Sequence, residues 1–271
     1  MMKVLDGREL ASYIKSRQSR EVTTLRLNHG KIPKLSIIQL KDDPIIDTYI
    51  RLKKKYGSDI GIEVDSYHPK QSEAMAIISK LNKDYTVDGI IVQLPIENIA
   101  QTDEILNSVA VYKDVDALAN GSEFDPATPT AILWLLAGYN IELSGKNILI
   151  IGNGKLVGKP LSKMLSDSGQ KVTIADTKTE NLEQLALASD IIITATGRPA
   201  ILNSNMIKPG TVIVDAGVAT DKGKTVGDLD EAIYLRDDLI ITPKRGGVGP
   251  LTICSLFAKV IKSAQKSVNK K

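Results

Sequence analysis

The stretch NILIIGNGKLVGKPLSKML, residues 147–165, decides the fold. It opens with an apolar run typical of a buried strand and passes into a helical pattern that starts near Leu156. Between the two stand Gly152, Gly154 and Gly158, at the spacing G-x-G-x-x-x-G. Glycines at such a turn let backbone N–H groups approach a pyrophosphate at the positive end of a helix. The stretch therefore predicts a dinucleotide-binding turn, and an ordinary strand-to-helix connection is the alternative.

Similar apolar runs alternate with amphipathic segments along the rest of the chain. The runs are rich in Ile and Val and nearly continuous, as expected for strands that are buried on both faces of a parallel sheet. Alternation of strands and helices predicts an α/β fold. We predict strands at 34–40, 62–67, 89–95, 147–152, 171–176, 190–196, 211–217 and 239–243. We predict helices at 7–27, 44–57, 71–83, 99–107, 129–138, 156–168, 180–187 and 250–267.

The length of the chain and one break in this pattern predict two domains. The chain has 271 residues, and domains are typically about 150 residues long. Residues 110–130 carry Asp, Asn, Gly and Pro without a clear period, as in an ordered loop. We place a first α/β domain at 1–140. A second domain at 141–249 is predicted to be a Rossmann-type, doubly wound parallel sheet.

Composition excludes several classes of protein. The formal net charge is only +3, from 35 basic and 32 acidic residues spread along the chain, which does not indicate a nucleic-acid partner. The single cysteine, Cys254, excludes an internal disulfide, and with only two histidines we expect no metal site. No apolar stretch reaches the ~18 residues that span a membrane, and the start of the chain lacks a signal-peptide pattern. We therefore expect a soluble, cytoplasmic protein without a membrane partner.

The second strand of the predicted Rossmann unit bears on the choice of cofactor. Asp176 ends that strand, where an acidic residue accepts hydrogen bonds from the adenosine ribose and favours NAD. Lys155, Thr177 and Lys178 lie close by in the motif and could instead hold the 2′-phosphate of NADP. The residues alone leave both cofactors open.

Further candidate cofactor-binding residues stand where the later strands end. Ligands of open α/β sheets lie at the carboxyl ends of the strands, and small residues gather there in TATG, VDAGV and KRGGVG. Together with the first turn, these segments add the candidates Asn153, Val157, Thr196, Gly197, Gly217, Val218 and Gly247.

In the first domain, four polar residues are candidates for chemistry. Tyr49 and Lys53 are four positions apart and share one helix face. A partly desolvated amine near other cations has a lowered pKa and can exchange protons near neutral pH. Gln93 could orient that amine without fixing its charge, and Asp116 could accept two N–H donors from a 2-aminopyrimidinone-type ring. The alternatives are a solvated helix face, packing roles and a loop anchor.

The motifs taken together resemble the methylenetetrahydrofolate dehydrogenase/cyclohydrolase family over nearly the whole chain. No single motif carries this resemblance, because each is short, but their order and spacing are specific. The motifs are DDPIIDTYIRLKKK, DGIIVQLPI, KDVDAL, IIGNGKLVGKP, IKPGTVIVDAGV, GDLD and TPKRGGVGPLT.

The resemblance implies a fold, an activity and a site. The fold is two α/β domains flanking a cleft, with the last helix, 250–271, returning to the first domain. The activity is oxidation of 5,10-methylenetetrahydrofolate with NADP, or NAD in some members, followed by hydrolysis of the methenyl product. Such proteins are usually homodimers. Tyr49 would stack on the folate, Lys53 would be the essential lysine, Gln93 would tune it, and Asp116 would hold the pterin. The implied substrate-binding set is Tyr49, Gln93, Leu94, Pro95, Asp116, Gly249 and Pro250.

The sequence departs from the family pattern at several positions near these motifs. Asn153 and Gly154 replace an Arg-Ser pair, Asp176 and Thr177 replace a His-Ser pair, and Ala117 replaces a glycine after KDVD. None removes a proposed catalytic group. Two other functions stay open: a dehydrogenase of a hydroxy or amino acid that uses Lys53 and Asp116 as an acid–base pair, and a non-catalytic dinucleotide-sensing module.

Overall fold

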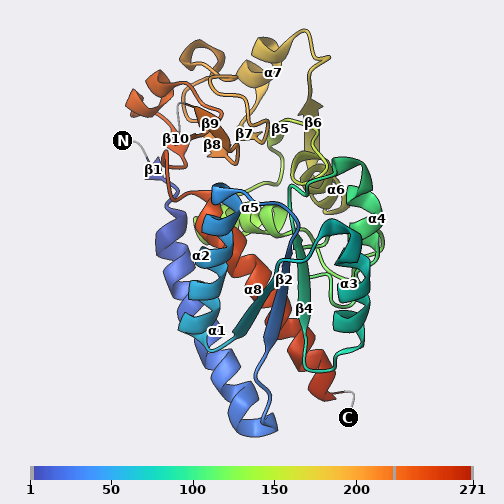
Figure 1. Cartoon of the computed structure of the whole chain (residues 1–271). Helices are drawn as coiled ribbons and strands as arrows, with labels where there is room; N and C mark the ends of the chain where they lie inside the picture. The colour runs from blue at the N-terminus through green and yellow to red at the C-terminus, as the bar shows by residue number, and fades with distance from the viewer. Residues whose placement is uncertain (1–2, 222–223, 270–271) are drawn as a thin grey trace. The chain divides into compact units, whose positions relative to one another are not determined.

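Two parallel sheets organise the chain. The structure, a computed structural model, describes residues 3–221 and 224–269 (Figure 1). By its contacts the chain divides into a unit of Met1–Ala11 with Thr128–Thr252 and a unit of Ser12–Ala127 with Ile253–Lys271. We call these the six-stranded unit and the three-stranded unit. This division places residues 1–11 and 128–140 in the six-stranded unit, whereas the sequence analysis groups them with the first domain.

The three-stranded unit is built on a small parallel sheet. Its strands are β2 (Lys34–Gln39), β3 (Glu63–Tyr67) and β4 (Gly89–Gln93), in the order β3-β2-β4. Strand β2 is central and almost entirely buried. The register pairs Gln39 with Gln93 at the carboxyl ends of β2 and β4, so both side chains emerge on the same face.

Helices cover both faces of this sheet. Leu35, Ile37 and Ile91 face a core shared with α1 (Gly7–His29), α2 (Pro44–Ile60) and α8 (Val248–Asn269). Ile38, Ile90 and Val92 face a second core, shared with α3 (Ala74–Lys83) and α4 (Thr102–Asn107). Adjacent residues therefore serve opposite cores, which explains why the strands read as continuous apolar runs. The 3₁₀ turns Gln71–Glu73 and Ile99–Gln101 lead into α3 and α4.

The six-stranded sheet is parallel throughout and has the order β1-β11-β8-β7-β5-β6. The chain passes from β5 to its neighbour β6 and then to β7 on the other side of β5, so the strand order reverses there. Such a switch point creates a ligand crevice outside the carboxyl ends of the strands. The strands are β1 (Lys3–Val4), β5 (Asn147–Ile151), β6 (Lys171–Ala175), β7 (Ile191–Thr194), β8 (Val212–Asp215) and β11 (Ile240–Ile241).

Helices and short turns surround this second sheet. Helix α6 (Gly158–Asp167) contacts β5 and β6, and α7 (Leu182–Ala188) contributes to an aliphatic core with Leu149, Ile192 and Ile213. Helix α5 (Ala127–Gly138) is apolar nearly all round and has four fully buried side chains. The remaining elements are the 3₁₀ turns Ser204–Met206 and Glu231–Leu235 and the antiparallel strands β9 (Ala219–Asp221) and β10 (Lys224–Val226).

The structure confirms the predicted α/β class, the two-part organisation and the Rossmann-type sheet. Each predicted strand is present, with bounds within two residues of those predicted. The sequence analysis missed β1, β9 and β10, which are two or three residues long. Strands of that length do not establish a period of two, and the partner of β1, strand β11, lies more than 200 residues away in the sequence.

Candidate active site

Helix α2 positions Tyr49 and Lys53. It starts sharply because the Asp43 carboxylate accepts hydrogen bonds from the N–H groups of Ile45 and Ile46, at 2.8 and 3.4 Å, with Pro44 in the first turn. Its buried stripe runs through Ile46, Ile50, Gly57 and Ile60. Lys53 falls on this stripe, three residues after Ile50, and is half-buried, whereas Tyr49 is 40% exposed. The cation-rich face expected of RLKKK therefore includes one amine that turns inward.

The Lys53 ammonium donates a hydrogen bond to the Gln93 amide oxygen at 2.5 Å. Gln93 is the last residue of β4, and its amide nitrogen donates to the Leu94 carbonyl at 3.1 Å, which aims the amide oxygen at the lysine. Burial lowers the pKa of Lys53, and the nearby charge of Asp116 opposes that shift in part. A neutral acceptor thus holds the amine without fixing it as an ammonium.

Asp116 lies in a turn that its neighbour Asp114 builds. The buried Asp114 carboxylate accepts hydrogen bonds from the N–H groups of Ala117 and Ala119, at 3.1 and 2.8 Å. Ala117 has a φ of 60°, in the left-handed region that favours the glycine usual at this position. Among the described residues, no side chain or backbone group hydrogen-bonds to the Asp116 carboxylate. Its two oxygens are therefore available to the N–H donors of a ligand.

The structure thus brings together Lys53, Gln93 and Asp116, which lie far apart in the sequence. Tyr49 lies one turn before Lys53 on the same helix. Leu94 and Pro95 follow Gln93 directly and are joined by a cis peptide bond. Gly249 and Pro250 stand in the first turn of α8, in the part of that helix that belongs to the six-stranded unit.

In the six-stranded unit, the turn between β5 and α6 needs glycine at two positions, because other backbone atoms lie too close for a side chain. Gly152 has a φ of 110°, and a Cβ there would lie 2.5 Å from the Ala195 carbonyl oxygen. A Cβ on Gly158 would lie 1.7 Å from the Gly152 carbonyl oxygen, so the turn folds tightly against the start of α6. Gly154, by contrast, has open space around it, and Asn153 and Lys155 are exposed. An open loop before a helix N-terminus fits a phosphate group.

The end of β6 places Asp176 at the next strand of the carboxyl edge. The Asp176 side chain is exposed, and one of its oxygens accepts the N–H of Lys178 at 2.9 Å, while the Thr179 hydroxyl accepts the Asp176 N–H at 2.9 Å. These bonds fold 176–179 into a turn that carries Thr177 at its exposed tip. A carboxylate, a hydroxyl and a lysine are thus held together where the adenosine ribose binds in Rossmann folds.

A half-buried carboxylate, that of Asp215, and a fully buried one, that of Asp228, order the strand ends of β7 and β8. The Asp215 carboxylate accepts hydrogen bonds from the Thr194 hydroxyl and the N–H of Gly217, at 3.1 and 3.0 Å. Burial raises its pKa. Asp228 is fully buried and accepts the N–H of Thr196 at 2.7 Å. A Cβ on Gly217 would clash with Asp228. The carboxylates therefore fix the backbone of TATG and VDAGV, and the exposed Val218 follows this buried arrangement.

The segment before α8 completes the carboxyl edge. A Cβ on Gly247 would lie 2.9 Å from Cβ of Thr242, so this glycine permits a tight passage after β11. Lys244, one of two cations in this segment, is hydrogen-bonded to Glu231 and lies over the Tyr234 ring, 5.2 Å from its centroid. Its neighbour Arg245 is exposed. Five turns expected from the sequence therefore stand at the carboxyl ends of one sheet: the glycine turn after β5, the Asp176 turn after β6, and the segments TATG, VDAGV and KRGGVG.

Sequence reasoning missed Asp215, Asp228 and Lys259. The two aspartates could have been found as acids at strand ends, because a carboxylate there commonly satisfies loop N–H groups. Lys259 is 7% exposed and lies on the apolar stripe of α8 with Leu256 and Ser263, at the spacing of three and four residues that marks one helix face. A lysine on such a stripe is a signal for a buried amine.

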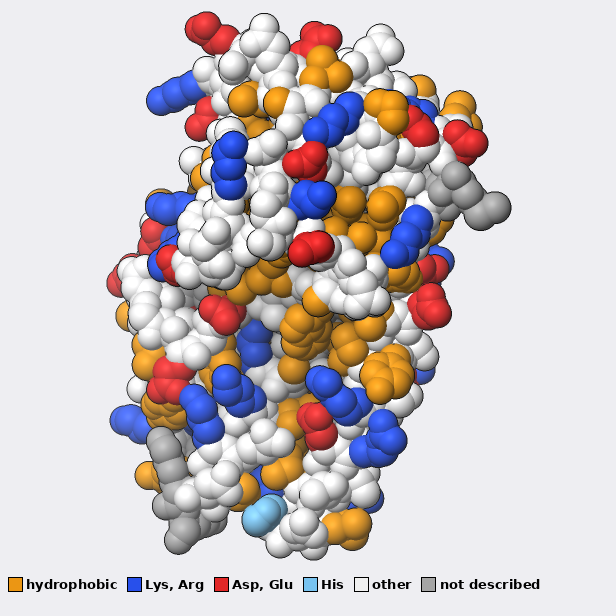
Figure 2. Space-filling model, turned by 180° about the vertical axis from the view of Figure 1, so that it is seen from behind, with side chains coloured by type: hydrophobic (Ala, Val, Ile, Leu, Met, Phe, Trp, Pro, Cys, Tyr) orange, Lys and Arg blue, Asp and Glu red, His pale blue; other side chains and the backbone are white. Residues whose placement is uncertain are grey.

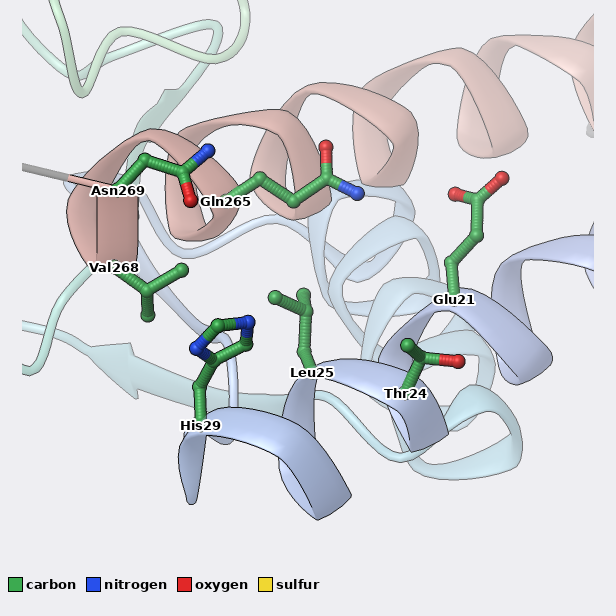
Figure 3. Close-up of a pocket in the computed structure, with 7 residues that line it drawn as sticks. All are labelled: Glu21, Thr24, Leu25, His29, Gln265, Val268 and Asn269. Atoms are coloured by element: carbon green, nitrogen blue, oxygen red, sulfur yellow. The ribbon is translucent and has the colours of Figure 1, made fainter.

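One pocket of the three-stranded unit is lined by none of these groups. Glu21, Thr24, Leu25 and His29 of α1 and Gln265, Val268 and Asn269 of α8 line a hollow of about 370 Å³ (Figure 3). None is a predicted site residue, and its lining brings no set of polar groups to one point. We therefore assign the chemistry to the Lys53 group on geometric grounds. Among residues 3–221 and 224–269, no cluster of His, Cys, Asp or Glu could hold a metal ion.

Surface charge and helix length give two further findings. On the face drawn in Figure 2, basic and acidic side chains are interspersed, which agrees with the small net charge. Within the part of the chain that the structure describes, every helix is too short or too polar to cross a membrane.

A parallel sheet with a switch point, a glycine turn before a helix and small residues at its strand ends define a dinucleotide-binding α/β enzyme. Comparison with known families identifies it further. Residues 5–116 match the tetrahydrofolate dehydrogenase/cyclohydrolase catalytic domain, and residues 126–268 match the NAD(P)-binding domain of the same family. The chain belongs to the tetrahydrofolate dehydrogenase/cyclohydrolase family and carries an NAD(P)-binding domain.

Individual relatives match this chain over nearly the full length of both proteins. The bifunctional protein FolD of Lactobacillus acidophilus is 37% identical over 279 residues, which cover 98% of each protein. The crystal structure of the bifunctional FolD of Campylobacter jejuni superposes with a TM-score of 0.92 at 36% identity, covering 98% of this chain and 99% of that one. The FolD of Trypanosoma brucei, complexed with NADP and an inhibitor, gives a TM-score of 0.92 at 28% identity and covers 98% of each chain. The predicted family and enzyme class are confirmed, which disfavours the two alternative functions.

Proposed function

We propose that this chain oxidises 5,10-methylenetetrahydrofolate to the methenyl form with NADP or NAD, and then hydrolyses the methenyl form to 10-formyltetrahydrofolate. The observation that carries the proposal is the Lys53–Gln93 hydrogen bond, with Asp116 close enough to affect the lysine. This group lies in the part of the chain that matches the catalytic domain of the family.

Asp116 and Tyr49 bind the pterin in this proposal. The carboxylate of Asp116 accepts two N–H donors from the 2-aminopyrimidinone ring, because neither of its oxygens has a partner among the described residues. Tyr49 is exposed enough to stack on the ring. Leu94, Pro95, Gly249 and Pro250 are proposed to line the rest of the substrate site.

Lys53 promotes the hydrolytic step. Water adds to the methenyl carbon, the bond from that carbon to N5 breaks, and the formyl group stays on N10. One proton of the water is delivered to N5 and the other is released. An amine with a lowered pKa can accept and return a proton in this sequence, and Gln93 keeps it aimed at the reacting carbon.

The glycine turn and the strand ends that follow it hold the dinucleotide. The open space at Gly154 and the N-terminus of α6 fit its pyrophosphate, and the Asp176 turn fits the adenosine ribose. When bound, the nicotinamide would supply the acceptor for the hydride that leaves the folate carbon. The role of the chain in this step is to position the two partners and to exclude competing chemistry. The cofactor set is Gly152, Asn153, Gly154, Lys155, Val157, Gly158, Asp176, Thr177, Lys178, Thr196, Gly197, Gly217, Val218 and Gly247.

The proposal extends to organisation and cellular context. Residues 1–140, joined by the helix over 250–271, form the folate-binding domain, and residues 141–249 form the dinucleotide-binding domain. The protein acts as a cytoplasmic homodimer that supplies one-carbon units, including those used in purine biosynthesis. Light scattering coupled to size-exclusion chromatography tests the dimer, and a monomer at micromolar concentration would contradict it.

A coupled spectrophotometric assay tests the reaction. Purified protein is mixed with methylenetetrahydrofolate and each dinucleotide in turn, and reduced cofactor is followed together with the methenyl absorbance and its decay. We expect hydride transfer followed by accelerated loss of the methenyl signal. Cofactor binding without turnover of the folate would contradict the proposal.

A further inference from the structure

Helix α8 presents a buried amine to the loop that carries Asp116. The Lys259 ammonium donates a hydrogen bond to the Val115 carbonyl at 3.1 Å, and the side chain is only 7% exposed. An ammonium has three N–H donors, and this bond uses one of them. Among the described residues no carboxylate forms an ion pair with Lys259.

Three carboxylates of that loop lie within electrostatic reach of Lys259. They belong to Asp116, Asp114 and Asp125. Asp114 is buried and committed to the turn, so without a nearby cation the loop would concentrate negative charge behind the ligand-binding carboxylate. The other charged groups here are already engaged: Lys113 donates to two carbonyls, and Lys266 pairs with Glu123.

Anchoring of the loop does not by itself account for an amine at this position. One turn after Lys259, the Ser263 hydroxyl donates to the Tyr112 carbonyl at 3.3 Å, and Lys266 holds Glu123 at 2.7 Å. A neutral donor could serve the Val115 carbonyl equally well. What the amine adds is a positive charge, and in a buried setting a charge acts strongly on its neighbours.

We propose that Lys259 is a positioning residue for the folate substrate: it holds the Val115 carbonyl and supplies the positive charge that lets Asp116 present its carboxylate to the pterin. The inference rests on the proposed function, because it takes Asp116 as the pterin-binding group. Lys53, which also interacts electrostatically with Asp116, serves the chemical step, and Lys259 serves binding.

The test compares four variants in steady-state kinetics with methylenetetrahydrofolate. Lys259→Met removes hydrogen bond and charge, and Lys259→Gln keeps a donor without the charge. Ser263→Ala removes a neighbouring loop anchor, and Lys262→Met removes an exposed charge from the same helix. We expect both Lys259 variants to raise KM about tenfold with less than about a threefold change in kcat, as for loss of one charge-assisted contact. The two control variants should leave KM within about twofold.

The pH dependence of KM provides a readout that a purely structural role would not move. The pKa of Lys259 is lowered to about 8 by burial. The wild-type KM should therefore rise as the pH passes through about 8 and the charge is lost, and Lys259→Gln should lack this rise. The difference between the two profiles isolates Lys259 from other titrating groups such as Lys53.

Several outcomes would overturn the inference. If Lys259→Gln keeps the wild-type KM and its pH dependence, and only Lys259→Met raises KM, then Lys259 acts only as a loop anchor. An unchanged KM in both variants would remove any role in binding. If Lys259→Met fails to fold, Lys259→Gln and the pH profile decide. A wild-type protein that does not turn over the folate rejects the proposed function instead, so the two failures are distinguishable.

Discussion

Replacing Gln93 with Met tests whether the amide tunes Lys53. The change keeps the length of the side chain and removes the oxygen that accepts the lysine ammonium at 2.5 Å. A hydrogen bond to a charged group contributes roughly 1.5–3 kcal/mol. If this interaction is realised in the hydrolytic transition state, its loss lowers the rate by about 10- to 150-fold.

The two steps should respond differently. Hydride transfer depends on positioning, so we expect Gln93→Met to slow reduction of the dinucleotide much less than decay of the methenyl absorbance. Lys53→Met removes the amine itself and should abolish the hydrolysis above the uncatalysed rate. Both reactions can be followed in one cuvette, because reduced cofactor and methenyl-folate absorb at different wavelengths.

Gln39 supplies a matched control. It is the cross-strand partner of Gln93, and its amide nitrogen donates to Asp47 at 2.8 Å rather than meeting the lysine. Gln39→Met removes a side-chain amide of the same kind from the neighbouring strand, so it should lower stability and leave hydrolysis within about twofold. Equal losses in both glutamine variants, or full hydrolysis in Lys53→Met, would refute the assigned roles.

Three further predictions concern stability and cofactor choice. Ala117→Gly relieves a left-handed backbone conformation and should stabilise the protein by about 1 kcal/mol, which corresponds to a rise in Tm of about 2–4 °C. Gly145→Ala places a side chain at a φ of 71° and should lower Tm. A lower Tm for Ala117→Gly would contradict this reasoning. Asp176→Ser should raise kcat/KM with NADP relative to kcat/KM with NAD, because a carboxylate repels the 2′-phosphate. An unchanged ratio would show that residues other than Asp176 determine the cofactor preference. The pKa of Lys259 is about 8 in the folded protein, against an ordinary value of 10.5. Between these two pH values the unfolded chain binds one more proton than the folded protein. The free energy of unfolding should therefore decrease as the pH falls from 10.5 to 8, by up to about 1.4 kcal/mol per pH unit. Urea unfolding at pH 8 and 9.5 should show this slope in the wild type and a smaller one in Lys259→Met, and parallel curves would rule it out.

The sheets were predictable from sequence because their strands are buried on both faces. Runs such as Leu35–Ile38 and Ile148–Ile151 leave little choice of structure once Gly and Pro bound them. The two-residue strand β1 could not be predicted, since it is defined only by its pairing with β11, more than 200 residues away. The contact-based division of the chain, which places 1–11 and 128–140 with the six-stranded sheet, likewise includes long-range pairing such as that of β1 with β11.

The candidate site divides in a similar way. The glycine turn follows from local geometry, and both Gly152 and Gly158 meet backbone atoms that exclude a side chain. The hydrogen bond of Lys53 with Gln93 did not follow from spacing, since 40 residues separate them; the chemistry of a neutral amide made it conceivable, and the family resemblance specified it. Lys259 was not expected at all, because a lysine in a terminal helix with several other lysines indicates a solvated face unless its position on the apolar stripe is weighed.

The half-buried Lys53 and the buried Lys259 both interact electrostatically with Asp116, and their hydrogen-bond acceptors explain why neither amine occupies that carboxylate. Lys53 donates to an amide and Lys259 to a backbone carbonyl, and among the described residues neither forms a hydrogen bond with Asp116. A direct ion pair would raise the pKa of the amine and occupy the oxygens that a pterin needs. Neutral acceptors avoid both effects: Lys53 keeps a lowered pKa for proton exchange, and Asp116 keeps its oxygens for the ligand. Loss of Lys53 should therefore appear in kcat of the hydrolysis and loss of Lys259 in KM of the folate, and a variant pair that showed the reverse would mean that the carboxylate is paired with one of them during turnover.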